Sequence, residues 1–499
     1  MKPSTLQQSY KGGMKRDGAR EQMAQGACWN VVDFLPEVLG ALLRKRGGYR
    51  WASQDVEALV SPAHAYSFPS GIVAEFSAGQ SVLVNDALGK FYEIESLTST
   101  EIIGGSAIGC RNPVFYNNMA IWPDRTGANA PVKITRAGGT HTSAALGGSP
   151  PAGRYALVYK DVLWLAGSVA TPDRIYFSVA GNPESWDLTT KWWDVSYPIT
   201  GLAALSNAVL VFSLQRTSRF RGSKPPPDPD FTVDDPVFEV GCTDNRSIQN
   251  YRDKCIFANA QGLYMTDGVA LEDLTRVCGM KAWWRDVMKG REGFQTGSPY
   301  SLANWIIAGG IYDDFYFYSI CRDDTGALID AGMIDLTRYA WTRLSNLNCQ
   351  FFFDRLYPQE LFWNPRLFAR IGTISDIFAP TSTNEIDCTL ENVFPYVETA
   401  FFAAEPGLKT FQDFFLTYDL TQSGVNNPAL RVSYSLVPEA ASYTALVPDL
   451  ALHGHNREHL EINIPGAGIA FRIEQVVAPA TDTRLHEIEV AASPRERSR

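Results

Sequence analysis

The chain has 499 residues, of which 45% are hydrophobic and 12% aromatic, and 44 basic residues stand against 54 acidic ones, a formal net charge of −10. This length suits two or three domains, and the hydrophobic content excludes a disordered chain. The negative charge argues against a surface dedicated to gripping phosphates, although brief passage of nucleic acid through a lumen is compatible with it.

The eight cysteines are scattered, without a Cys-x-x-Cys pair. Their spacing predicts neither a disulfide framework nor a zinc knuckle, and we expect synthesis in a reducing compartment. The opening residues, MKPSTLQQSYKGG, lack the apolar region of a signal peptide, and no apolar run reaches the length of a membrane helix. We therefore expect neither export by a leader nor a membrane span.

Residues 1–60 mix paired glycines, scattered charges and short apolar pieces such as CWNVVDFL. This texture predicts an N-terminal arm and not an independent domain. Arg44 and Arg46 belong to a basic cluster with Lys45 and Arg50, for which a solvated turn is favoured over an anion contact. We expect the apolar pieces to dock on a neighbouring subunit, and packing along the chain's own propeller is the alternative.

From residue 61 to about 385, short apolar runs are closed by Gly, Pro, Asn or Asp, which is typical of antiparallel strands and their turns. The densest stretch, 155–222, contains YALVY, VLWLAG, RIYFSV and AVLVFSL. Four-stranded units of this kind need neighbours around a ring to cover both faces. About six or seven irregularly spaced units predict a β-propeller over 61–385.

Inside that stretch, Gly181-Asn182-Pro183 predicts a turn that is followed by Trp186. An indole beside such a turn can cover the loop, so we expect Trp186 to be a packing residue with no part in a reaction.

Two segments interrupt the strand pattern. The proline-rich residues 224–236, KPPPDPDFTVDDP, predict a loop or crossing segment and not a central strand. Residues 271–289 show the clearest helical periodicity and predict a helical insertion. Its favoured role is packing between blades, with partner docking as the alternative, and its assembly candidates are Trp283 and Trp284.

After about residue 386 the strands become longer and alternate apolar with polar residues, as in EHLEINIP. This alternation predicts sheets with one face in a core, and we expect a C-terminal β-sandwich over 386–491. Residues 492–499 form a short basic tail that we expect to be disordered. The chain as a whole is thus predicted to be all-β, with an arm, an irregular propeller and a sandwich.

Signatures of catalysis are missing or weak. No phosphate-binding loop, nucleophile elbow or His-Glu-x-x-His motif occurs. The stretch from His455 to His459 fits the inverted zinc-peptidase pattern, but that pattern requires a helix and a period-two run follows it. We therefore expect no catalytic residue, no metal site and no cofactor. Aspartate pairs that could suggest a hydrolase are expected at turns, where they bond the backbone: Asp234-Asp235, Asp313-Asp314 and Asp323-Asp324.

The order of motifs resembles the β-propeller tail proteins of tailed bacteriophages, namely the nozzle and DNA-stabilisation (plug) proteins and related minor tail proteins. The resemblance is carried by Lys11-Gly12-Gly13 with ALLRKRGGY, by RIYFSVAGNPESWD (174–187), by ITGLAALSNAVLVFSLQRTSRFRG (199–222), by GCTDNRSIQNYRDKCIFANAQGLYMTDG (241–268) and by the helix with Trp283 and Trp284. It spans nearly the whole chain as a pattern.

The resemblance implies a structural component of the virion tail, made in the host cytoplasm. It would form a homo-oligomeric ring of about six copies that lines the DNA exit channel. The implied partners are portal, adaptor or other tail proteins, with transient contact to phage DNA. The alternative is a propeller that binds or cleaves host surface glycans, which exposed Trp192 and Trp193 would favour by offering planes for sugar stacking.

Overall fold

The computed structural model describes a large part of the chain, and every structural statement below concerns these residues: 4–8, 14, 16–17, 28, 30–32, 34–36, 43–45, 50–51, 62–67, 82–86, 90–95, 98–102, 113–137, 140–222, 230–289, 305–322, 328–345, 347, 349–356, 365–371, 373–376, 396–403, 409–421, 429–438, 442–451, 456–477 and 482–494.

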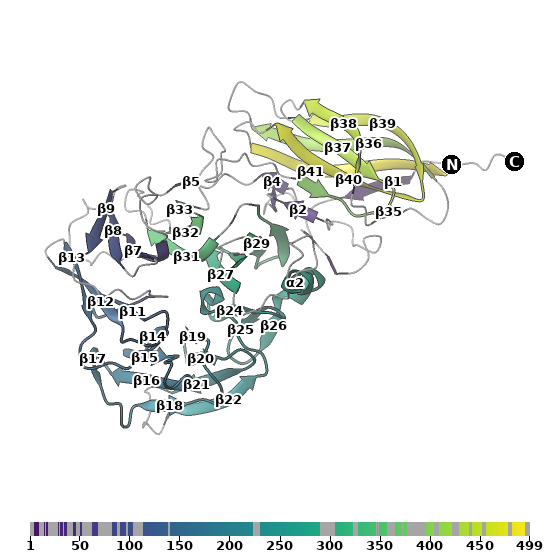
Figure 1. The fold of residues 1–499 in the computed structure, drawn as a ribbon. Coiled ribbons are helices and arrows are strands. Elements are labelled where there is room, and N and C mark those ends of the chain that lie inside the picture. The colour runs from purple at the N-terminus through teal and green to yellow at the C-terminus, as the bar shows by residue number, and fades with distance from the viewer. Residues whose placement is uncertain are drawn as a thin grey trace.

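The described residues form an all-β fold in which seven antiparallel sheets stand around a ring, as blades of a propeller (Figure 1). The first three blades are β6 (Pro62–Ser67), β7 (Val82–Asp86), β8 (Phe91–Glu95) and β9 (Thr98–Ile102); β10 (Val114–Tyr116), β11 (Met119–Trp122), β12 (Val132–Ala137) and β13 (Thr140–Ala145); and β14 (Tyr155–Tyr159), β15 (Val162–Ala166), β16 (Arg174–Val179), β17 (Asn182–Trp186) and β18 (Trp192–Asp194).

Blades four to seven continue around the ring. They are β19 (Gly201–Ala204), β20 (Ala208–Phe212), β21 (Thr217–Arg221) and β22 (Thr232–Phe238); β23 (Gln249–Tyr251), β24 (Lys254–Asn259), β25 (Gly262–Thr266) and β26 (Leu271–Asp273); β27 (Trp305–Tyr312), β28 (Phe315–Arg322), β29 (Leu328–Asp335) and β30 (Ala340–Arg343); and β31 (Cys349–Leu356), β32 (Pro365–Ile371) and β33 (Thr373–Asp376) with β5 (Arg50–Trp51).

The second strands of the blades explain why apolar runs in the sequence predict strands of this fold. Strands β15 and β20 are buried at every residue, because neighbouring blades cover both faces of each sheet. Such strands are continuous apolar runs and not alternating ones. The runs expected at 155–159, 162–167, 174–179 and 208–214 are accordingly found as β14, β15, β16 and β20.

The ring is closed by a strand from the beginning of the chain. Trp51 in β5 is the register partner of Ser375 in β33, so the outermost strand of blade seven precedes blade one in sequence. The innermost strands β31 and β6 also lie beside each other. Closure of this kind ties the two ends of a propeller together and leaves blade seven with its full complement of strands.

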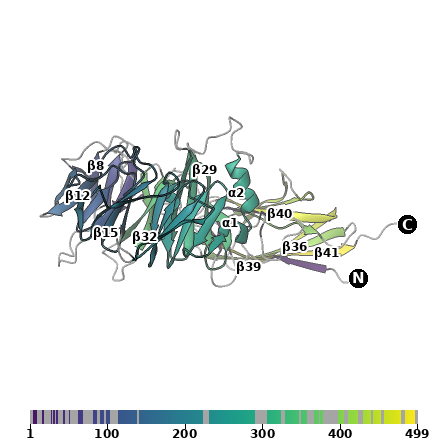
Figure 2. The ribbon, with the colours of Figure 1, turned by 90° about the horizontal axis from the view of Figure 1, so that it is seen from below.

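The C-terminal strands form a sandwich beside the propeller (Figure 2). One sheet contains β1 (Ser4–Gln8), β3 (Phe34–Pro36), β4 (Leu43–Lys45), β41 (Asp482–Pro494), β36 (Lys409–Thr421) and β39 (Asn456–Gly466); the other contains β34 (Tyr396–Glu398), β35 (Phe402–Ala403), β40 (Gly468–Val477), β37 (Ala429–Ser435) and β38 (Thr444–Ala451). Phe414 and Phe471 from the two sheets meet with their ring centroids 4.6 Å apart, inside the core between them.

A single strand joins the two parts. Strand β2 (Asn30–Val32) pairs in parallel with β30 of blade six and antiparallel with β34 of the sandwich. Blade six and one sandwich sheet are therefore one hydrogen-bonded sheet of ten strands. Val31 and Val32 of this strand are buried.

The N-terminal segment contributes five short strands to sheets formed by later parts of the chain. Strands β1 to β5 lie within residues 1–60, and all of them pair with strands of the same chain. These strands add to the sandwich, to the connecting sheet and to blade seven, which agrees with the alternative of packing within the same chain; docking on a neighbouring subunit stays a prediction. Arg44 lies in β4 and not in a turn, while Arg46 lies outside the described residues.

Three further expectations need adjustment. Residues 232–236 of the proline-rich segment belong to β22, an edge strand, where proline is tolerated because one side of the strand makes no ladder bonds. The helical insertion is split into α1 (Leu274–Val277) and α2 (Lys281–Met288), with Gly279 between them at a φ of 69°. Strand β41 reaches Pro494, so part of the expected tail is ordered; residues 495–499 lie outside the described part.

Candidate functional site

We call one face of the propeller the upper face. It carries the turns between the second and third strands of each blade and the connections to the next blade. On it, blades three to five surround a cavity of about 800 Å3, the rim pocket. The rim pocket is lined by Arg154, Tyr155, Thr200, Leu214, Gln215, Arg216, Glu239, Val240, Gly241, Thr243, Asp244, Asn245, Arg246, Asn259, Ala260 and Gln261.

Hydrogen bonds to backbone carbonyls join the loops of blades four and five at this pocket. The Cys242 N–H donates to the Ser213 carbonyl at 2.9 Å, and the Asn259 side chain donates to the Gly241 carbonyl at 2.9 Å. A Cβ atom on Gly241 would stand 2.0 Å from the Ser213 oxygen, so only glycine allows this approach. The loops of blades four and five are thus locked together at the pocket.

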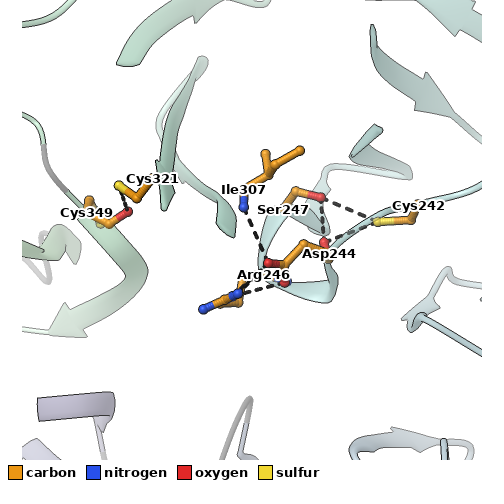
Figure 3. A network of polar contacts seen from close by, with 7 residues as sticks. All are labelled: Cys242, Asp244, Arg246, Ser247, Ile307, Cys321 and Cys349. Carbon is orange, nitrogen blue, oxygen red and sulfur yellow. Dashed lines mark hydrogen bonds and ion pairs between the residues drawn. The ribbon is translucent and has the colours of Figure 1, made fainter. Parts of the chain in front are cut away.

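Asp244 is the central residue of the adjoining polar network (Figure 3). Its carboxylate accepts from the Arg246 backbone N–H at 3.0 Å, pairs with the Arg246 guanidinium at 2.5 Å, and accepts from the Ile307 N–H of blade six at 3.3 Å. The Asp244 and Arg246 side chains are only 8% and 10% exposed. Figure 3 also shows the bond from Cys321 to the Cys349 carbonyl, which links blades six and seven.

The thiol nearest to this network is not a nucleophile at neutral pH. Cys242 donates to the Asp244 carbonyl at 3.2 Å, and burial raises the pKa of its thiol to about 12. Only the thiolate attacks or binds metal, so Cys242 is a packing residue.

Two other arginines at the pocket are more accessible. Arg216 pairs with Glu239 at 2.7 Å, and its guanidinium lies 4.8 Å from the centre of the Tyr197 ring. Arg154 donates from Nε to the Thr126 carbonyl at 2.8 Å. The rim pocket therefore combines fixed backbone with accessible cations, which suits binding and offers no nucleophile activated by a base.

The helix candidates Trp283 and Trp284 are buried at a second cluster, the anchor cluster, defined by Asp330, Arg343, Trp283, Tyr318 and Trp341. The Asp330 carboxylate accepts from Trp283 Nε1 at 3.0 Å, from the Tyr318 hydroxyl at 3.1 Å and from Arg343 Nε at 3.2 Å. Trp341 Nε1 donates to the Tyr318 oxygen at 3.0 Å, and burial raises the pKa of that phenol well above its ordinary value.

The anchor cluster fastens α2 to blade six. The Arg343 guanidinium lies 4.3 Å from the centre of the Trp283 ring, and Trp284 Nε1 donates to the Asn259 carbonyl of blade five at 3.0 Å. Arg16, near the beginning of the chain, also lies over Trp283. These contacts agree with the packing role that the sequence favours for the helix.

Trp186 is half-buried at the end of β17. Its Nε1 donates to the Pro183 carbonyl at 2.9 Å, and its ring packs against an apolar cluster between blades two and three. The turn itself lies at Ala180-Gly181, since Asn182 and Pro183 already belong to β17, which corrects the predicted Gly-Asn-Pro turn; the Trp186 ring is a packing group beside it.

Trp192 and Trp193 do not form a joint platform for a sugar. Neighbouring residues of a strand face opposite sides of the sheet. The Trp192 ring is covered by the Arg174 guanidinium at 3.7 Å, and Arg174 also holds Asp194. Trp193 is 38% exposed and packs edge-on to Phe231.

The residues considered for chemistry lie apart. His459 is on strand β39, where it contacts Asp413 at 2.7 Å and stacks on Phe415. Asp313 and Asp314 lie at the expected turn, whereas Asp323 and Asp324 are outside the described residues. In the described part of the chain, no group of His, Cys, Asp or Glu is placed to hold a metal ion.

The pair Asp234-Asp235 lies in strand β22 and not at a turn, contrary to expectation. Asp234 pairs with Arg219 at 2.7 Å, and Asp235 accepts from the Ser218 and Ser196 hydroxyls at 2.6 and 2.8 Å. Both carboxylates therefore have ion-pair or hydrogen-bond partners on or beside blade four.

Sequence analysis did not identify Asp330, Arg343, Arg154 or Arg216. The signal available for Asp330 was a lone aspartate inside the apolar run LIDAGMI, since a carboxylate buried among apolar residues needs partners. The pocket arginines carry no comparable signal, because they lie in loops that meet only when the blades assemble.

None of the helices in the described part of the chain has the length and hydropathy needed to cross a bilayer. No family model matches the chain, and the search of curated proteins finds no relative.

Among solved structures, the chain is similar to BamB from Moraxella catarrhalis, with a TM-score of 0.33 and 11% identity over 75% of this chain and 96% of that one. It is similar to YCF48 bound to D1 peptide, with a TM-score of 0.33 and 10% identity over 64% and 96%. An exo-beta-1,3-galactanase from Phanerochaete chrysosporium has a TM-score of 0.28 and 9% identity over 90% and 100%. These likenesses are too low to bear on function, and the all-β propeller fold is established by the strand order of the blades.

Proposed function

We propose that the protein is a structural component of a bacteriophage tail, forming a homo-oligomeric ring that lines the DNA exit channel and performs no catalysis. The observation that carries this proposal is the sheet of ten strands that runs from blade six into the sandwich. A hydrogen-bonded sheet that continues from one part into the other suits a subunit of a wall. The motif resemblance gives the setting.

A role as a wall also agrees with the polar sites. Among the described aspartates weighed for catalysis, Asp234 pairs with Arg219 and Asp314 accepts from the Tyr251 hydroxyl. Burial holds the Cys242 thiol protonated. The net charge of −10 would let DNA pass without being held. The ring of about six copies, the portal-side neighbours and the location in the virion belong to this proposal.

Imaging of the complete chain and of the particle tests the proposal. We expect negative-stain micrographs of the expressed full chain to show rings, and immunogold labelling to mark the tail of the purified virion. A protein that stays monomeric at all concentrations and is missing from purified particles would contradict it. Removing residues 1–60 is unsuitable as an assembly test, because it also removes β2 and β5 from the fold.

The glycan-binding alternative has one supporting observation, the exposed face of Trp193. It predicts that Trp193→Ala abolishes binding of the full chain to host polysaccharide while Leu188→Ala, a change at another exposed apolar residue of the same blade, does not. Absence of saturable binding by the unaltered chain would remove this alternative.

A further inference from the structure

The lining of the rim pocket contains more arginines than carboxylates. Three arginines and two carboxylates line it, on a chain whose net charge is −10. Arg246 and Asp244 are paired with each other and almost fully buried, so they stabilise the loop and take no further partner from solvent. The charge that a ligand would meet is therefore that of Arg154, Arg216 and Glu239.

The two remaining arginines are available to a new acceptor. Among the described residues, Arg154 has no carboxylate partner, and its Nε bond to the Thr126 carbonyl orients the guanidinium without neutralising it. Arg216 is 34% exposed and its partner Glu239 is 69% exposed. Exposed ion pairs contribute little to stability, so a carboxylate from a ligand can displace Glu239 at little cost.

Apolar side chains stand beside these cations. Leu214, in the lining of the rim pocket, is 59% exposed, and Tyr197, which stacks with Arg216, is 41% exposed. Arginine and tyrosine are, with tryptophan, enriched among the residues that carry most of the binding energy of protein interfaces. The exposed leucine next to them adds apolar surface for an apolar side chain. The site thus pairs two anion-binding groups with an apolar contact.

We infer that the rim pocket binds an acidic peptide segment of a partner protein, with carboxylates on Arg154 and Arg216 and an apolar side chain on Leu214 and Tyr197. Charge complementarity selects an acidic occupant. A peptide fits better than nucleic acid, because tight binding to a nucleic-acid backbone uses many phosphate contacts and this site offers only two accessible arginines, one of them paired with Glu239. The inference does not depend on the proposed tail function.

Fluorescence anisotropy with the full chain tests this inference. The probe is a short labelled peptide of alternating Glu and Leu; a Lys and Leu peptide of equal length and an oligothymidylate serve as comparisons. We expect saturable binding of the acidic peptide with a Kd below about 1 mM, weakening as salt is raised, and no saturation by the basic peptide. Equal or tighter binding of the oligothymidylate at the same site would assign the pocket to nucleic acid and overturn the inference.

Four variants locate the binding. Arg216→Glu and Arg154→Glu should each weaken it about tenfold or more, and Leu214→Ser should weaken it about threefold. Glu239→Gln should tighten it about threefold, because it releases Arg216 from its ion pair and removes no group that contacts the peptide. The matched control is Arg252→Glu, which breaks an exposed Arg252–Asp314 pair of 2.9 Å on the opposite face and should leave the Kd unchanged.

The inference fails if the acidic peptide does not saturate, or if Arg216→Glu and Arg252→Glu have the same effect. Thermal melting of each variant separates loss of binding from loss of fold. Because Glu239→Gln is expected to increase affinity, its result cannot arise from a folding defect.

Discussion

The anchor cluster and the rim pocket use the same three groups, an arginine, a carboxylate and an aromatic ring, for different ends. In the anchor cluster, Arg343 pairs with Asp330 at 3.2 Å over Trp283, and the Asp330 side chain is 1% exposed. At the rim pocket, Arg216 pairs with Glu239 at 2.7 Å over Tyr197, in contact with solvent.

Burial decides which of the two clusters the protein needs for its stability. A buried ion pair is costly to break because the remaining charge has no water to replace its partner, whereas an exposed pair is readily replaced by solvent. The first cluster is therefore part of the fold, and the second is available for binding. The shorter distance belongs to the weaker pair, so distance alone does not rank these interactions.

The largest expected effect is that of Asp330→Asn. It removes the charge that balances Arg343 and disturbs the acceptor of Trp283 and Tyr318, so we expect a loss of about 3–5 kcal/mol in the free energy of unfolding. Chemical denaturation followed by tryptophan fluorescence measures it. Glu239→Gln is the matched control at the exposed cluster and should change the free energy by less than about 1 kcal/mol. Equal losses in both variants would show that burial does not separate the clusters.

The next largest loss of stability is expected from replacing Trp284 of helix α2, with Trp186 at the end of strand β17 for comparison. Trp284 is fully buried, and Trp284→Ala should cost about 3–5 kcal/mol, as truncations of buried aromatics do. Trp186 is half-buried, and Trp186→Ala should cost about 1–3 kcal/mol. Thermal melting of the two variants side by side checks the order. A Trp186 variant that loses more than the Trp284 variant would mean that the loop contact matters more than the helix anchor.

An intermediate effect is expected from the Lys133–Glu184 pair between blades two and three. Lys133 Nζ donates to Glu184 at 2.7 Å and the Gly147 N–H donates at 2.7 Å, and these bonds lower the pKa of Glu184 below its ordinary value. A lowered pKa in the folded state stabilises the protein above the ordinary glutamate pKa of about 4.3, and this contribution is lost as pH falls through the folded value.

Unfolding midpoints measured from neutral pH down to about 3 test this linkage. Glu184→Gln should flatten the acid side of the profile, and Lys133→Met should flatten it in the same direction because it removes the largest cause of the shift. Parallel profiles for the variants and the unaltered chain would show that the pair is not linked to folding.

The smallest effect on stability is expected from Arg216→Ala. The side chain is partly exposed and its ion pair is open to water, so the free energy of unfolding should change by less than about 1 kcal/mol. Thermal melting checks it, with Arg343→Ala as the contrasting variant of the buried pair. A large loss in Arg216→Ala would place the rim pocket among the elements that hold the propeller together.

Local patterns in the sequence were sufficient for the all-β class, for the four strands of the 155–222 stretch and for the turn at Asp313-Asp314. An apolar run closed by turn residues forms the same strand wherever it lies in the ring, because its hydrogen bonds and its burial repeat from blade to blade. The burial of Trp284 in α2 also agrees with the helical periodicity of the sequence.

Only the tertiary structure decided where residues 1–60 go and which arginines remain accessible. Pairing of β5 with β33 and insertion of β2 between β30 and β34 join residues far apart in sequence, and any open strand edge would satisfy their backbone equally well. Likewise, Arg216 and Arg343 are indistinguishable as residue types. Their difference lies mainly in the carboxylate partner that the fold supplies, because Asp330 is 1% exposed whereas Glu239 is 69% exposed.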